Sequence, residues 1–165
     1  MTAGNLVPDW APGTLAEPPA GLLALWLTAW AEEQQASFIV VLRDDRRAQE
    51  LATGLRSLAP SLRVVHLQAW DCMPYDRLQP SRAVMGHQVA AVQELARTAE
   101  RNVVVTTPSG LGQRVPPPAS LAPLRIDIAV GTPLDREVLA LFLQQNGYVA
   151  DERVDEPGET ALRAS

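Results

Sequence analysis

Few residues in this chain of 165 residues could carry out covalent or metal chemistry. There is one cysteine, Cys72, and there are two histidines, His66 and His87. A cysteine nucleophile needs a histidine base beside it, and a zinc site needs a cluster of cysteine and histidine ligands. Because the sequence contains no such cluster, Cys72 is expected to be a small buried hydrophobic residue. We therefore predict no catalytic residue and no metal site.

Nucleotide chemistry is the next possibility, because apolar strands alternate with helical segments. A phosphate-binding loop needs a glycine-rich turn with free amides, a lysine for the phosphates and a hydroxyl for magnesium. All 14 basic residues are arginine, and the turn before the first helix contains Pro18 and Pro19, which lack amide donors. The sequence therefore predicts that the chain binds no ATP and no other cofactor. A nucleotide hydrolase or helicase-type domain is kept as an alternative, which ATP-dependent thermal stabilisation would reveal.

The acidic pair Asp44 and Asp45 follows an apolar strand, as does the magnesium-binding pair of receiver domains. Such a domain also needs an aspartate after its third strand and a lysine later in the chain. Here the third strand ends in Thr106, Thr107 and Pro108, and lysine is absent. The pair is therefore predicted to cap a helix. A receiver-like switch stays open as an alternative, and magnesium titration would test it.

The loop of residues 68–80 is the most distinctive stretch of the sequence. It follows an apolar strand and precedes a long helical pattern, and in open α/β sheets such a loop is where ligands or partners are met. Trp70 is predicted to pack into the core. Further along the loop, Tyr75, Asp76 and Arg77 are equally compatible with a partner surface and with a loop packed on the sheet.

The elements that position this loop are predicted from hydrophobic periodicity. Apolar runs indicate parallel strands at 38–42, 62–67 and 102–107, the first of them central in its sheet. Helices are expected from Pro18 and Pro19 onward, from Asp44 and Asp45 to Leu58, and over 81–100, with a short helical turn at 109–114. The first helix is apolar nearly all round and should be buried. The fold class is α/β, a parallel sheet with flanking helices.

The remainder of the chain reads as part of a smaller α+β domain. A stiff proline connector at 116–118 marks the boundary. Beyond it the pattern predicts a strand at 124–130, a helix at 134–146 capped by Thr132, and strands at 148–154 and from 160 onward, with Gly147 ending the helix in a left-handed conformation. The predicted division is a flexible arm at 1–18, an α/β domain at 19–118 and a partial α+β domain at 119–165.

Composition narrows the partners and the compartment. The net charge of −5 offers no broad basic field for nucleic acid. One cysteine forms no internal disulfide, and neither a signal peptide nor a run long enough to span a membrane is recognisable. The sequence predicts a cytoplasmic protein with no membrane contact.

Four segments then carry a resemblance to a known family. The segment Trp70-Asp71-Cys72-Met73-Pro74-Tyr75-Asp76, with Pro80 and Ser81 following, resembles a signature near the start of bacterial transcription-repair coupling factor (Mfd), with Met73 where that family usually has leucine. Segments 104–116, 146–148 and 156–163 match in order. The chain thus resembles a truncated N-terminal, UvrB-like region of Mfd. The resemblance implies a UvrB domain-1a-like, degenerate P-loop NTPase fold, with Trp70, Asp71, Pro74 and Pro80 as structural motif residues.

The resemblance also implies an adaptor function. The parent recognises stalled RNA polymerase, removes it by ATP-driven translocation along DNA, and recruits UvrA for nucleotide excision repair. Its ATP site and its polymerase and DNA contacts lie outside this segment, so the chain itself is expected to be non-enzymatic, with a weak or incomplete UvrA interface. Arg163 matches a family contact arginine, Glu159 belongs to the preceding turn, and Arg153 stands in for an arginine replaced by Val149. A solvated edge-strand arginine is the alternative for Arg163.

Overall fold

A computed structural model describes residues 18–72, 77–97 and 101–162. The predicted arm up to residue 17 lies outside this part, as do Pro74, Tyr75, Asp76 and Arg163. In chain order the elements are α1 (Ala20–Gln34), β1 (Phe38–Val41), α2 (Asp45–Leu58), β2 (Arg63–Leu67), α3 (Arg82–Arg97), β3 (Asn102–Thr106), α4 (Pro108–Leu111), α5 (Pro118–Leu121), η2 (Ala122–Leu124), α6 (Arg136–Gln145), β4 (Val149–Ala150) and β5 (Glu159–Thr160). The fold is α/β, as the sequence predicts.

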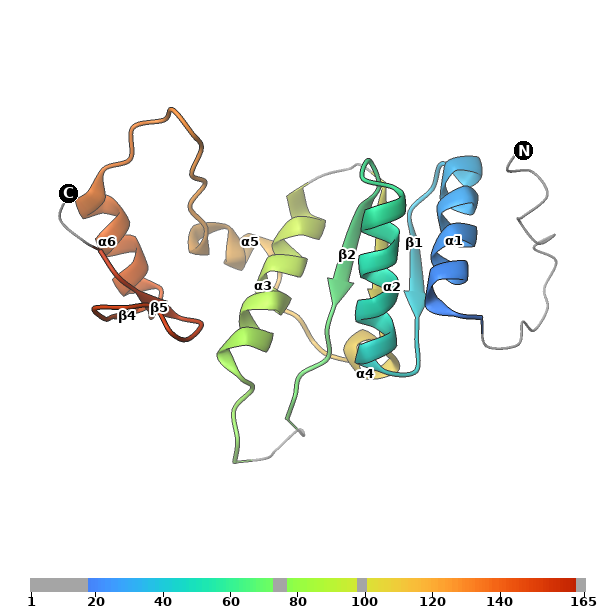
Figure 1. Ribbon diagram of the computed structural model, residues 1–165. Helices are drawn as coiled ribbons and strands as arrows, with labels where there is room; N and C mark the ends of the chain where they lie inside the picture. The colour runs from blue at the N-terminus through green and yellow to red at the C-terminus, as the bar shows by residue number, and fades with distance from the viewer. Residues whose placement is uncertain (1–17, 73–76, 98–100, 163–165) are drawn as a thin grey trace.

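Three parallel strands form the main sheet in the order β1-β3-β2 (Figure 1). The prediction that the first strand is central is wrong, because β3 inserts between β1 and β2 and leaves β1 at an edge. Ile39 and Val41 of β1 are 56% and 45% exposed. An apolar run indicates burial on both faces, but in the described part of the chain the second face of this strand is uncovered.

One face of the sheet carries the main core. The helices α1 and α2 pack against each other, and α2 also contacts β2 and β3. The fully buried side chains here include Leu51, Leu55, Val103 and Val105. Close approach of the two helices depends on Gly54, where an added Cβ would lie 3.1 Å from that of Ala24.

The helix α1 is less buried than its composition predicts. Only Ala24, Leu27 and Ala31 are buried in it, whereas Leu22 and Leu25 are exposed. A helix that is apolar all round is expected in a core, but α1 contacts chiefly α2, on one side. No helix in the described part of the chain is both long and apolar enough to cross a membrane.

Helix α3 packs against β2, and α5 packs against α3. Buried Leu121 lies in α5, and its carbonyl accepts a hydrogen bond from Gln93 Nε2 at 2.9 Å. Two predicted helix starts are confirmed by their caps. The Asp44 Oδ1 atom accepts from the Arg47 amide at 2.8 Å, and Ser81 Oγ accepts from the Val84 amide at 3.3 Å.

The C-terminal part departs most from prediction. No strand forms over 125–130, where Ile128 and Val130 are exposed and no neighbouring strand pairs with them. The cap of α6 is Asp135 rather than Thr132, since the Asp135 carboxylate accepts from the Glu137 and Val138 amides at 2.8 and 3.3 Å.

The end of α6 agrees with prediction. Gly147 has φ +79°, a left-handed conformation that glycine adopts at no steric cost. The amides of Gly147 and Tyr148 donate to the Gln144 and Leu143 carbonyls at 3.1 and 3.0 Å, which completes a Schellman motif. The strands that follow are shorter than predicted, two residues each, and pair in parallel.

Candidate partner-binding surfaces

The base of the loop at 68–80 is held by a buried glutamine. Gln88 on α3 is 4% exposed, and its Nε2 donates to the Gln68 carbonyl at 3.2 Å and to Gln113 Oε1 at 2.9 Å. The same Gln113 oxygen accepts from the Trp70 amide at 3.1 Å. The first residues after β2 are therefore tied to α3 and to the segment after α4. Sequence analysis did not predict these hydrogen bonds.

Side chains of β3 and α2 fix the same chain exit. Thr106 Oγ1 donates to the Leu67 carbonyl at 2.8 Å, and Asp45 Oδ1 accepts from the Ala69 amide at 3.4 Å. Gly110 lies against this point, where an added Cβ would be 2.5 Å from Thr106 Oγ1 and 3.0 Å from the Leu67 carbonyl. Only glycine fits at 110 without a shift of the neighbouring backbone.

The far end of the loop is closed by Asp71. Its Oδ1 accepts from the Ser81 amide at 3.0 Å, which joins residues ten positions apart. Hydrogen bonds from the Ser81 side chain and backbone stabilise the carboxylate and lower the pKa of Asp71. Trp70 and Pro80 are half-buried, so the packing role predicted for Trp70 stays a prediction.

The loop presents Arg77 and Leu78 to solvent, and Leu78 is 71% exposed. Tyr75 and Asp76, predicted with Arg77 as a partner surface, lie outside the described residues. The described part of the loop therefore exposes an arginine and a leucine at consecutive positions.

Both histidines line one groove, a feature that sequence analysis did not predict. The groove has a volume of about 460 Å³ and lies over β2, with residues of α2 and α3 on its sides. The Nε2 atom of His66 is buried there without a hydrogen-bond partner. Burial lowers the pKa of His66, and nearby Arg56 and His87 lower it further, against an opposing effect of Asp45.

The described residues include no cluster of three or more acidic, histidine or cysteine side chains able to hold a metal. The acidic pair instead serves the fold, since Asp44 caps α2 and Asp45 binds the Ala69 amide. Cys72 is half-buried. The loop and the groove described above offer hydrogen-bonding and apolar contacts to a partner.

The second candidate surface is the small unit around β4 and β5. The Glu159 carboxylate accepts from the Asp155 and Glu156 amides at 2.8 and 2.9 Å, so it shapes its own turn. Arg153 is exposed, and its Nε donates to Asp155 Oδ1 at 2.6 Å. Arg163 is not described, so the structure does not place the three predicted contact residues of this unit together.

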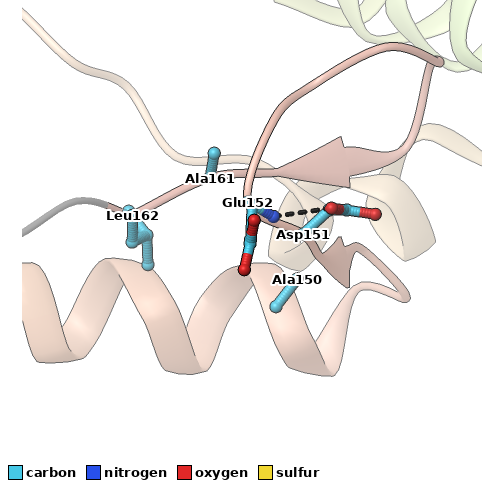
Figure 2. A pocket seen from close by; sticks show the side chains of 5 residues that line it. All are labelled: Ala150, Asp151, Glu152, Ala161 and Leu162. Atoms are coloured by element: carbon cyan, nitrogen blue, oxygen red, sulfur yellow. Dashed lines mark hydrogen bonds between the residues drawn. The ribbon is translucent and has the colours of Figure 1, made fainter.

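A hollow of about 690 Å³ lies where this small sheet ends (Figure 2). Asp151 and Glu152 line it from the chain after β4, and Ala161 and Leu162 line it from the chain after β5. The Glu152 amide donates to Asp151 Oδ1 at 2.6 Å. A partner would meet acidic and apolar groups together at this hollow.

These features define an α/β parallel-sheet module with two candidate surfaces for a partner, the loop after β2 and the small unit. Comparison with known proteins places it among named relatives. It is 31% identical over 145 residues to the transcription-repair-coupling factor of Haemophilus influenzae, 29% over 137 residues to that of Myxococcus xanthus, and 25% over 151 residues to that of Escherichia coli. No protein-family model matches the chain.

These matches confirm the resemblance that the motifs suggest, and the chain is a relative of the transcription-repair-coupling factors. They cover 88%, 78% and 92% of the chain. The chain spans only 12%, 11% and 13% of the length of those relatives.

Proposed function

We propose that this chain is an adaptor module in transcription-coupled DNA repair, and that its small C-terminal unit recruits UvrA. The observation that carries the proposal is the similarity to transcription-repair-coupling factors over 88% of the chain. Of the described motif residues, Trp70, Asp71 and Pro80 belong to the loop after β2, and Tyr148 and Glu159 belong to the small unit. The sheet domain serves as the scaffold from which the small unit is presented.

The site of recruitment would be the segment that begins at Gly158 and leads through β5 to Arg163. Arginine is enriched among the residues that dominate binding energy in interfaces, provided that a rigid surface holds it. The hollow lined by Asp151 and Leu162 lies beside this segment, and gives a partner both a polar and an apolar contact. Glu159 lies within this segment, and Arg153 lies on the connection between β4 and β5.

The chain would act without catalysis of its own. The acidic pair is used within the fold, and the chain has no lysine for a phosphate site. ATP hydrolysis and contacts with RNA polymerase and DNA belong, in this proposal, to other parts of a whole coupling factor. The module would work in the cytoplasm, where transcription and repair meet in bacteria.

Calorimetry with purified UvrA tests the proposal. The chain should bind UvrA weakly, and Arg163→Ala should reduce the affinity about fivefold or more. Arg46→Ala is the matched control, because Arg46 is an exposed arginine on α2 paired with Glu50. No binding by the unaltered chain, or equal loss with Arg46→Ala, would contradict UvrA recruitment. Equilibrium dialysis against magnesium-ATP tests the alternative of a nucleotide hydrolase, and clear micromolar binding would favour that alternative.

A further inference from the structure

Two arginines outside the predicted contact residues hold the two ends of the segment Gly158–Leu162. Arg82 opens α3 and lies against Gly158, and Arg136 opens α6 and binds the Leu162 carbonyl. We infer that Arg82 and Arg136 are positioning residues that present this segment to a protein partner. The inference rests on the proposed function for the identity of that partner, but the ordering of the segment can be tested alone.

The contact of Arg82 is with the backbone of a glycine turn. A Cβ added at Gly158 would lie 3.2 Å from Cδ and 3.4 Å from Nη1 of Arg82. Gly158 also has φ +92°, which side-chain-bearing residues rarely adopt. Position 158 therefore requires glycine for two reasons. One is its backbone conformation, and the other is that the stem and guanidinium of Arg82 cover it.

Gly158 is joined to the small sheet through its own peptide group. Its carbonyl accepts from the Val149 amide at 2.9 Å, and the Thr160 carbonyl accepts from the Asp151 amide at 2.8 Å. A displacement of the turn is thus transmitted to β4 and β5 directly. Strands of two residues have few hydrogen bonds of their own, so outside contacts matter more here than in the main sheet.

Arg136 acts at the other end of the segment. Its Nη2 donates to the Leu162 carbonyl at 3.0 Å, across 26 residues of sequence. A hydrogen bond from a guanidinium is stronger than one between neutral groups. The residue that follows Leu162 is Arg163, the predicted contact arginine, so Arg136 holds the peptide unit immediately before it.

A groove beside Arg82 explains why this one side chain can affect the order of the small unit. It has a volume of about 520 Å³ and lies between the first turns of α3 and the small unit, with Pro157 and Gly158 of the β4–β5 connection in its lining. One wall comes from the first turns of α3, beginning at Arg82, and the other from two of the four motif segments, represented by Tyr148 and Pro157. Because the groove separates α3 from the small unit, the long side chain of Arg82 at its edge can connect the two.

Hydrogen exchange of the full chain tests the inference without a partner. In Arg82→Ala and in Arg136→Ala, the amides of Val149 and Asp151 should exchange about tenfold faster, since local opening of the unit becomes easier. Arg82→Lys should restore most of the protection, because lysine keeps the aliphatic stem that covers Gly158. Arg46→Ala should change nothing. Unchanged exchange in both alanine variants would overturn the inference.

Titration with UvrA then separates positioning from direct contact. Both alanine variants should lower the affinity about threefold to tenfold, in proportion to their loss of protection, while the thermal transition of the sheet domain stays in place. A loss of affinity without faster exchange would make these arginines contact residues and overturn the inference. If the unaltered chain fails to bind UvrA but the exchange result holds, the proposed function fails and the positioning role stands.

Discussion

The exit of β2 and the small C-terminal unit both carry motif residues, yet they are held in opposite ways. Around the exit of β2, buried or half-buried side chains from three elements bind the backbone, among them Gln88, Thr106 and Gln113. In the small unit, α6 has no buried residue and the two strands are exposed or half-buried. Its side-chain hydrogen bonds come from exposed or half-buried groups, such as exposed Arg136 and half-buried Glu159.

The comparison shows that buried contacts hold the exit of β2, whereas surface contacts hold the small unit. Buried polar bonds are lost only when the domain opens, because an unpaired buried group is costly. Surface bonds exchange with water and leave a region free to open by itself. The first residues after β2, up to Trp70, should therefore be as stable as the sheet, and the small unit should unfold locally at lower free energy.

The largest expected effect is from Gly110→Ala. The new methyl group would overlap Thr106 Oγ1 and press on the Leu67 carbonyl, and overpacking of this kind costs about 1–3 kcal/mol or more. Chemical denaturation should show that loss for the whole sheet domain. Gly86→Ala is the matched control. Nothing lies within 4 Å of its added Cβ, and alanine in a helix should stabilise by about 0.5–1 kcal/mol. Equal stability of the two variants would remove the steric argument.

Next in size is Gln88→Leu. The Gln68 carbonyl loses a buried donor, which should cost about 1–3 kcal/mol in urea denaturation. The Trp70 amide should lose protection from exchange together with the sheet. Gln49→Leu on the exposed surface of α2 is the control and should change stability by less than about 0.5 kcal/mol. Loss of protection at Trp70 without a loss of global stability would mean that this loop opens independently.

A pH dependence should come from His66. Its pKa is lowered in the folded protein, first by burial, so the unfolded chain takes up the proton first as pH falls below about 6.5. Stability should therefore be constant above neutral pH and decrease between about pH 6.5 and the lower folded pKa of His66. Urea midpoints in this window check it, and His66→Gln should remove the dependence. The pKa of Asp71 is also lowered, but its contribution is lost only at more acidic pH.

The smallest global effect is expected from Glu159→Ala. The variant loses two hydrogen bonds to the amides of Asp155 and Glu156, so those amides should exchange faster. Global stability should change by less than about 0.5 kcal/mol. Glu152→Ala serves as the control in the same unit. A global loss comparable to that of Gln88→Leu would show that the small unit and the sheet unfold together.

Local signals made part of the fold predictable. Asp44, Ser81 and Gly147 each act within a few residues of their own position, and the structure confirms all three roles. At the start of α6 two residues suited to capping lie three positions apart; the prediction named Thr132, whereas the structure uses Asp135. The apolar run of β1 predicted a strand but not which strands lie beside it. Its place at the edge of the sheet could therefore not be deduced.

The contacts of the candidate surfaces were less accessible to sequence analysis. Gln88 and Gln113 are 25 positions apart and meet only because β2, α3 and α4 are arranged as they are. Asp71 was recognised as a motif residue, but its bond to Ser81 spans a loop of no standard length. In the sequence, Arg82 and Arg136 look like ordinary helix arginines. Only the fold brings Arg82 to the turn at Gly158 and Arg136 to the Leu162 carbonyl.

The outer edge of β2 has one further consequence, for self-assembly. Alternate residues of a strand direct their peptide groups to the same edge, and here Val64, His66 and Gln68 share the side away from β3. The Arg56 guanidinium donates to the Val64 carbonyl at 3.0 and 3.3 Å, and Gln88 occupies that of Gln68. A strand from another molecule would therefore find two of these three carbonyls already bound by side chains of this chain. The sheet is therefore protected on this side against the edge-to-edge pairing that begins many protein aggregates.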